Sequence, residues 1–176
     1  KSKFNRLIFL ILGMGLVACT GQPAEIRGEA FELYLAADDQ AHGWDVIDTP
    51  LEDLELAETP LLITADLVSY DRDTHTIELT DEGYQKVTDL LEAGFQVAGI
   101  PFVVVSGGER IYAGAFWTHL SSQSFDGVVI MDPAFQSDEN TIQITLGYPG
   151  RGFFIGADPR EDSRLLDALD AVGVLK

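Results

Sequence analysis

The stretch "IPFVVVSGGERIYAGAFW", residues 100–117, decides how this chain folds. A β-branched run is followed by Gly107 and Gly108 and then by a second run with several aromatic residues. Two adjacent glycines accept the positive φ angles of a tight turn, so the stretch is predicted to form a β-hairpin. Because the run "FVVV" has no alternation of apolar and polar residues, it indicates a central strand that is covered on both faces.

Further strand-like segments lie on both sides of this hairpin. They are residues 30–36, the two halves of 67–79 around a polar turn at Asp71–Thr74, and the segments 127–132 and 141–148. The last of them, "TIQITLGY", alternates in the way that a half-exposed strand does. Residues 37–58 carry leucines among many acids, and this pattern is compatible with a short helix or with an irregular loop.

A helix is predicted to start directly after the strands of 67–79. Thr80 can cap it, while Asp81 and Glu82 suit the positive end of its dipole, and Gly94 provides a stop. Its apolar residues share one face, and they are Tyr84, Val87, Leu90 and Leu91.

A second helix is predicted near the end of the sequence. Asp158 is expected at its N-cap, Pro159 at its first position and Glu161 at its third, as an acidic variant of the capping box. The apolar stripe that follows consists of Leu165, Leu166, Leu169 and Val172 and ends at Gly173. Strands and helices therefore show no regular βαβ alternation. We predict an α+β domain with a mainly antiparallel sheet and about two helices packed on one face.

The first 18 residues have the pattern of an export signal. Lys1, Lys3 and Arg6 precede an apolar run from 7 to 18, which is too short to cross a bilayer as a helix, since that needs about 20 residues. The four residues 16–19, Leu-Val-Ala-Cys, resemble the lipobox of bacterial lipoproteins. This resemblance implies a diacylglyceryl group on the Cys19 sulfur, cleavage before Cys19, and attachment to the outer face of a membrane. A plain secretory signal with an incidental cysteine is the alternative.

The charge of the chain restricts its partners. Its formal net charge is −18, and removal of residues 1–18 would take away three of the eleven basic residues and none of the 29 acidic ones, which leaves −21. Such a chain is expected to bind no nucleic acid, because it has no basic patch for the phosphates. Residues 19–28 are predicted to form a polar tether, and residues 29–176 are predicted to be a single domain.

Residues 101–130, "PFVVVSGGERIYAGAFWTHLSSQSFDGVVI", resemble a group of uncharacterised bacterial lipoproteins. More distantly, they resemble the head subdomain of the periplasmic domain of SecD, a protein-export membrane protein. The shared pattern is an apolar strand, a glycine turn, an isoleucine-containing return strand and a glycine-led strand after a connection. The resemblance implies an α+β head that touches extended polypeptides, and it implies no catalytic residue. SecD-like proteins have several transmembrane helices, so their export activity is not carried over to this chain.

Catalytic chemistry has few candidates in this sequence. A nucleophilic serine would come from Ser106, Ser121, Ser122 or Ser124 and its histidine from His42, His75 or His119, but no Gly-x-Ser-x-Gly elbow is present. Asp71, Asp73 and His75 alternate in "DRDTH" and would share one face of an extended strand, although no second metal-binding motif accompanies them. Turn formation accounts for the same residues. No cofactor is predicted, and an envelope hydrolase with a carboxylate, metal or histidine site near His75 or His119 stays as an alternative.

A calcium-dependent binding module is the other alternative. The loop 132–140, "DPAFQSDEN", offers oxygen ligands but lacks the spacing and the glycine of an EF-hand.

Aromatic residues gather in the C-terminal half of the chain, beside loops such as "FWTHLSSQSFDG" at 116–127. They either fill a core or form a binding surface. If they form a surface, Trp117, His119 and Asp126 are the expected ligand-binding residues. The leading hypothesis is a non-enzymatic, lipid-anchored envelope protein that binds a partner, with polypeptide as the favoured class.

Overall fold

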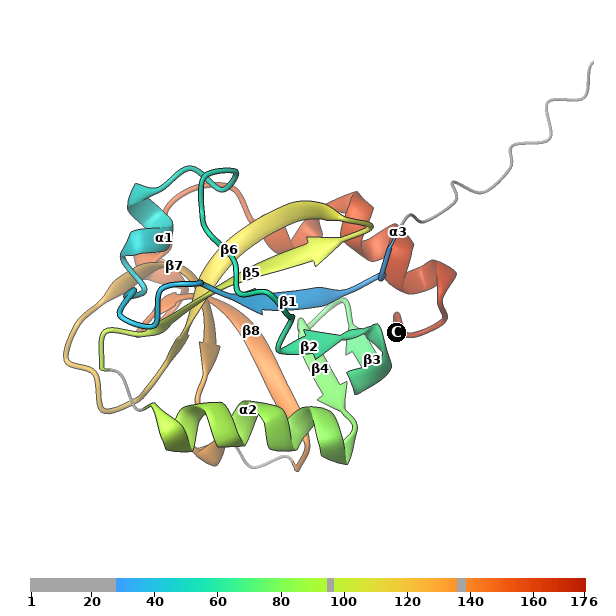
Figure 1. Cartoon of the computed structure of the whole chain (residues 1–176), viewed down its shortest axis with the longest axis horizontal. Helices are drawn as coiled ribbons and strands as arrows, with labels where there is room; N and C mark the ends of the chain where they lie inside the picture. Colours follow the sequence, from blue (N-terminus) through green and yellow to red (C-terminus); the bar gives the residue numbers. More distant parts are fainter. Residues whose placement is uncertain (1–27, 95–96, 136–138) are drawn as a thin grey trace, which may run out of the picture.

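The computed structural model describes residues 28–94, 97–135 and 139–176. Within these residues the chain forms one eight-stranded sheet and three α-helices (Figure 1), which confirms the predicted α+β class. The strands are β1 (Glu32–Leu35), β2 (Leu62–Ile63), β3 (Leu67–Asp71), β4 (Thr76–Leu79), β5 (Ile100–Ser106), β6 (Glu109–Trp117), β7 (Phe125–Met131) and β8 (Thr141–Tyr148). The helices are α1 (Asp45–Asp48), α2 (Asp81–Ala93) and α3 (Ser163–Ala171). Four short 3-10 turns are η1 (Thr64–Asp66), η2 (Pro133–Phe135), η3 (Arg151–Phe153) and η4 (Pro159–Glu161).

The predicted hairpin of residues 100–117 is confirmed as β5 and β6. Gly107 and Gly108 have φ angles of 58° and 80°, as the turn requires. β5 lies between β1 and β6, and every residue from Pro101 to Ser106 is buried. The unalternated apolar run is therefore explained by cover on both faces of the sheet.

The strand order is β2-β1-β5-β6-β7-β8-β4-β3, and the sheet is mainly antiparallel, since among these strands only β6 and β7 run parallel. Its two edge strands, β2 and β3, follow one another in the chain and are separated only by η1. Because three residues span a short distance, the two ends of the sheet must lie close together, and the sheet is curled (Figure 1). The last residues of the chain cover the free edge of β3, where Tyr70 N donates to Val174 O at 2.8 Å.

Apolar side chains pack on both faces of the curled sheet. The main core contains Leu33, Phe102 and Ile144, and α2 and α3 both pack against it, α2 through Val87 and α3 through Leu165, Leu166 and Leu169. The opposite face carries a smaller cluster of Ala115, Trp117, Phe125 and Val129, against which Val46 of α1 packs. The two longer helices thus cover the same core, as expected, and the short α1 covers the other face.

The helix boundaries confirm one prediction and correct another. Thr80 caps α2 by accepting a hydrogen bond from Gly83 N at 3.1 Å. The C-terminal helix, however, begins at Ser163, four residues later than the predicted start at Pro159. Asp158 caps the separate turn η4, and Asp162 caps α3 by accepting from Arg164 N at 2.9 Å. The extended ψ of 121° at Asp162 ends the first turn and starts the helix anew.

The predicted apolar stripe of this helix also ends earlier than expected, because Val172 is 47% exposed. Residues 37–58 contain the four-residue α1 and otherwise irregular backbone, so both readings of this span hold in part. Among the described residues, no helix has the length and hydropathy needed to cross a membrane. The predicted signal segment 1–18, Cys19 and most of the tether lie outside the described residues.

Candidate functional site

The three ligand-binding residues expected from the sequence lie in different environments. Trp117, at the end of β6, is only 1% exposed, and its ring stacks on Phe125 with centroids 4.8 Å apart. Phe116 and Phe125 are also buried. The structure therefore places Trp117 in the interior, where it fills the smaller core and does not present its ring to a surface ligand.

Two glycines make room for the Trp117 indole. A Cβ atom at Gly99 would lie 2.5 Å from the Trp117 ring, and one at Gly43 would lie 2.7 Å from it. Both distances are too short for a side chain, so the backbone itself covers the indole. This cover comes from segments that are distant from Trp117 in sequence.

His119 lies two residues beyond the end of β6 and lines a cleft of about 450 Å³, which we call the β8 cleft. Met131, Tyr148, Arg151 and Arg160 also line it. Tyr148 Oη holds the loop that carries His119, since it donates to the Ser121 carbonyl at 3.2 Å. The structure thus places His119 beside Tyr148 in this cleft, whereas Trp117 and Asp126 do not line it.

The two arginines of the β8 cleft are already engaged within the protein. Arg160 donates to both oxygens of Asp158, at 2.9 and 2.6 Å, and to the Ile144 carbonyl at 2.7 Å. Arg151 holds its guanidinium 5.0 Å above the Phe154 ring. These contacts give the cleft a fixed shape and leave Arg160 few donors for an anion.

Asp126 is partly exposed and sits at the start of β7. Its carbonyl accepts from Ile155 N at 3.3 Å, and its buried Oδ1 has no hydrogen-bond partner in the described part of the chain. Two other buried polar atoms, Trp117 Nε1 and Tyr112 Oη, likewise have no hydrogen-bond partner in the described part of the chain.

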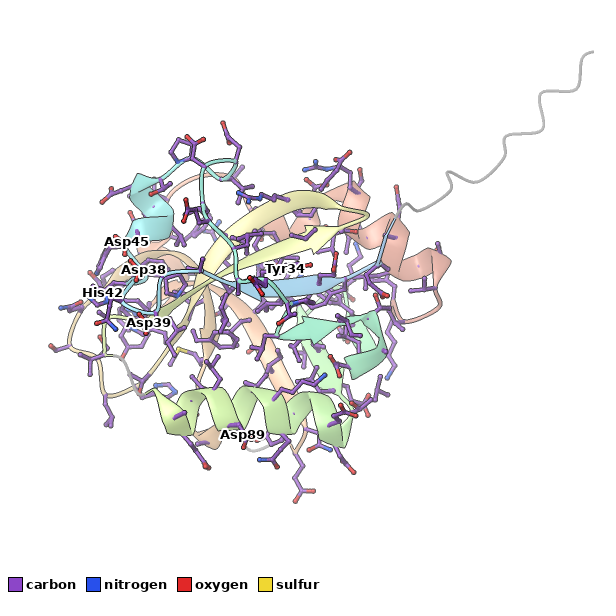
Figure 2. All side chains as sticks on the ribbon, viewed as in Figure 1. Tyr34, Asp38, Asp39, His42, Asp45 and Asp89 are labelled. Carbon is purple, nitrogen blue, oxygen red and sulfur yellow. The ribbon has the colours of Figure 1, made fainter. Side chains whose placement is uncertain are left out.

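A second cleft of about 450 Å³ lies between the loop after β1, the end of α2 and the start of β5. Leu35, Leu90, Ile100 and Pro101 supply apolar surface, and the exposed Asp38 and Asp39 line the same space. We call it the acidic cleft. Figure 2 shows Asp38 and Asp39 at one end of the domain, close to His42 and Asp45.

Exposed apolar side chains continue the surface beside the acidic cleft. They are Trp44 and Ile47 of the α1 region, Val97 and Leu120, of which Val97 is 50% and Leu120 67% exposed. Hydrogen bonds join the three segments that carry them, because Gly43 N donates to Ala98 O at 2.8 Å and Ser121 Oγ donates to Val97 O at 2.7 Å. We call these four residues the distal apolar patch.

His75, a catalytic candidate in the sequence, lies inside the protein with 5% of its surface exposed. Its Nδ1 lies 3.1 Å from Tyr70 Oη, and its Nε2 lies 3.5 Å from Glu161 Oε1. Burial lowers the pKa of His75, so the neutral ring is favoured, and burial also raises the pKa of Tyr70. A neutral His75 with its proton on Nε2 accepts a hydrogen bond from the Tyr70 hydroxyl at Nδ1 and turns its N–H toward Glu161.

Two of the other catalytic and metal candidates, Asp71 and Ser106, have structural contacts. Asp71 accepts from Thr74 N at 2.8 Å, which forms the turn between β3 and β4, while His75 points into the core. Ser106 is buried and donates to the Ala30 carbonyl at 2.8 Å. Across residues 28–94, 97–135 and 139–176, no three histidine, cysteine or acidic side chains are grouped so as to hold a metal ion. The centre of the suggested calcium loop, residues 136–138, lies outside the described residues.

Comparison with known proteins gives no further assignment. Neither the models of protein families, nor characterised proteins, nor solved structures match this chain.

Sequence reasoning missed the acidic cleft as a site. The available signal was the composition of residues 37–58, which contain eight acids and no lysine or arginine, together with Trp44. The apolar surface of the cleft, however, comes from β1, α2 and β5, so it cannot be predicted from residues 37–58 alone.

Proposed function

We propose that this protein is a lipid-anchored binding protein of the bacterial cell envelope. Cys19 carries the lipid, residues 19–28 form the tether, and the α+β domain binds a polypeptide partner. The N-terminal sequence supports the anchor, because a basic start, a short apolar run and the Leu-Val-Ala-Cys pattern occur together. An anchor with two or more acyl chains would hold the protein stably at the membrane surface.

One geometric relationship carries the binding part of the proposal. The described chain begins at Gly28, beside the Gly107–Gly108 turn, while the loop with Asp38, Asp39 and Asp45 lies at the other end of the longest axis (Figures 1 and 2). A domain attached through Gly28 would therefore hold the acidic cleft and the distal apolar patch away from the anchor. Exposed apolar side chains next to a cleft are typical of interaction surfaces.

The anchor is tested by labelling cells with an alkyne fatty acid and separating their membranes. The wild type and the control Thr20→Ala are expected to carry the label and to sediment with membranes. Cys19→Ala is expected to lose the label and to appear in the soluble fraction, because the thiolate is the atom that is acylated. If Cys19→Ala keeps its label or stays with the membranes, the lipoprotein assignment is wrong.

A further inference from the structure

The acidic cleft and the distal apolar patch are neighbours, because the loop after β1 contributes to both. Ala41 lines the cleft, and three residues later Trp44 belongs to the patch. On the other side of the cleft, Ile100 and Pro101 follow closely after Val97. Trp44 is also tied to the Leu120 loop, since its Nε1 donates to Gln123 Oε1 at 3.4 Å. A ligand that enters the cleft can thus contact the patch as well.

The segment that lines this surface carries an excess of negative charge. Residues 37–58 contain eight acids without any lysine or arginine. The described ranges hold seven lysines and arginines, and five of them form ion pairs with acids outside this segment, namely Arg72, Lys86, Arg160, Arg164 and Lys176. A sixth, Arg151, stacks on Phe154. The seventh, Arg110, lies against this segment and donates to the Leu51 carbonyl at 2.6 Å. Six of the seven cations of the described ranges are thus engaged elsewhere.

The end of α2 adds to the negative potential in the cleft. Leu90 and Gly94 line the cleft, so the carbonyl end of this 13-residue helix points toward that region. The last turn of α2 contains no basic residue, and its partial negative charge is therefore not offset there.

From this combination we infer that the surface binds a basic, amphipathic polypeptide segment. This inference rests on the proposed function and specifies its partner. Apolar side chains of the segment would enter the acidic cleft and cover the distal apolar patch, while its lysines and arginines would face the acids of residues 38–48. Opposite charge on the partner would speed association and disfavour other partners.

Other occupants fit this surface less well. An anionic lipid surface would be repelled by the carboxylates. A second copy that used the same patch would bring two sets of acids into contact, because a two-fold interface pairs each surface with itself. A basic polypeptide satisfies both the apolar and the charged part of the surface.

The test uses the purified full chain in a neutral detergent and labelled peptides of about twenty residues, which are about 30 Å long when helical. All peptides share the same leucines and phenylalanines, and their polar positions are lysine and arginine, glutamine, or glutamate. We expect the basic peptide to bind and the other two to bind at least about tenfold more weakly, a difference of about 1.4 kcal/mol. Raising the salt from about 50 to about 200 mM should weaken the basic peptide several-fold, because exposed charges are screened over shorter distances.

Two pairs of variants locate the binding surface. Asp38→Asn with Asp39→Asn should weaken the basic peptide about fivefold or more, whereas Asp167→Asn with Asp170→Asn, on the exposed side of α3, should change its affinity less than twofold. Leu120→Ser should weaken the peptide, whereas Val68→Ser, at a comparably exposed valine of β3, should not. All six substituted positions are exposed, so none of these variants removes a side chain from the core.

The outcomes distinguish the proposed binding of polypeptides from the inferred preference for basic segments. If all three peptides bind equally, polypeptide binding stands and the inferred preference for basic segments is wrong. If none binds, or if Cys19→Ala protein binds vesicles of phosphatidylglycerol in place of peptides, both the partner inference and the polypeptide part of the proposed function are wrong. The anchor itself is judged by the labelling of Cys19 and does not depend on any of these results.

Discussion

The Lys86 ammonium lies 2.8 Å from the Asp66 carboxylate and so ties α2 to the turn between the two edge strands of the sheet. Asp66 is buried, and its other oxygen accepts from Ile63 N at 2.9 Å. Its carbonyl accepts from Thr80 N, directly before α2. One side chain and its backbone thus connect β2, η1 and the start of α2, where the curled sheet comes together.

Loss of Lys86 should therefore destabilise the protein. In Lys86→Ala the buried Asp66 carboxylate loses its cation, and we expect the free energy of unfolding to fall by about 2–3 kcal/mol, somewhat less than for a fully buried pair because Lys86 is partly exposed. Chemical denaturation of the purified protein measures this change.

Lys176→Ala is the matched control, because Lys176 pairs with Glu78 on the surface. Exposed ion pairs contribute about 0–1 kcal/mol, so this variant should lose less than 1 kcal/mol. Adding Asp66→Asn to Lys86→Ala should restore part of the loss, since it removes the unpaired charge. Equal losses in the two lysine variants would contradict the structural role of Asp66.

The packing of β6 against β5 and β7 gives a second prediction. A Cβ atom at Gly114 would lie 2.6 Å from the Phe102 ring and 2.6 Å from the Val128 carbonyl oxygen. Because the carbonyl belongs to a neighbouring strand and cannot move aside, Gly114→Ala should lower the free energy of unfolding by about 3 kcal/mol or more. Gly152→Ala has no atom within 4 Å of the new Cβ and should change stability by less than about 0.5 kcal/mol. Similar melting temperatures for the two variants would show that β6 packs differently.

The N-cap of α2 gives a third prediction. Thr80→Ala removes the acceptor for Gly83 N and should cost about 1 kcal/mol. Thr88→Ala, inside the same helix, removes a β-branched residue whose Oγ1 donates to the Gln85 carbonyl within the helix. It should be neutral or slightly stabilising. Thermal unfolding of both variants measures the two changes in stability. A larger loss of stability for Thr88→Ala than for Thr80→Ala would place the start of the helix elsewhere.

Local sequence patterns predicted the elements of this fold well, because each depends on neighbouring residues. The glycine pair at 107–108 defines the hairpin, and Thr80 defines the start of α2. The start of α3 was misplaced for the same local reason. Asp158 and Pro159 form a complete capped turn of their own, and only the extended backbone at Asp162 shows that a second cap follows.

The position of Trp117 could not be predicted in this way. Its burial depends on Gly43 and Gly99, whose approach to the indole results from the fold and not from any spacing in the sequence. The sequence pattern of the aromatic residues around it does not distinguish a core from a binding surface. The acidic cleft has the same origin, because β1, α2 and β5 meet there from distant parts of the chain.

The buried His75 gives a prediction about pH. Burial, and after it the positive charge of Arg160, lowers the pKa of His75 below its ordinary value of 6.5, although Asp158, Glu161 and Asp71 oppose this change. The unfolded chain then binds more protons than the folded protein in the interval below pH 6.5. Stability should be fully present above pH 6.5 and should decrease as the pH falls from 6.5 to the lowered pKa.

Denaturation at a series of pH values between 7 and 5 tests this prediction on three proteins. His75→Asn is the informative variant, because asparagine tolerates the left-handed backbone at this position, where φ is 52°, and does not titrate there. We expect its stability to depend less on pH than that of the wild type in this interval. His42→Asn, at an exposed histidine, should keep the dependence of the wild type. The carboxyl groups with a lowered pKa are Asp71, Asp158 and Asp162, whose ordinary value is 3.8, and Glu78, whose ordinary value is 4.5. Their contribution to stability is lost mainly as the pH falls below these values, which lie under the interval tested. If His75→Asn and the wild type lose stability in parallel, His75 is not neutral and buried in the folded protein, and its contact with Tyr70 must be different.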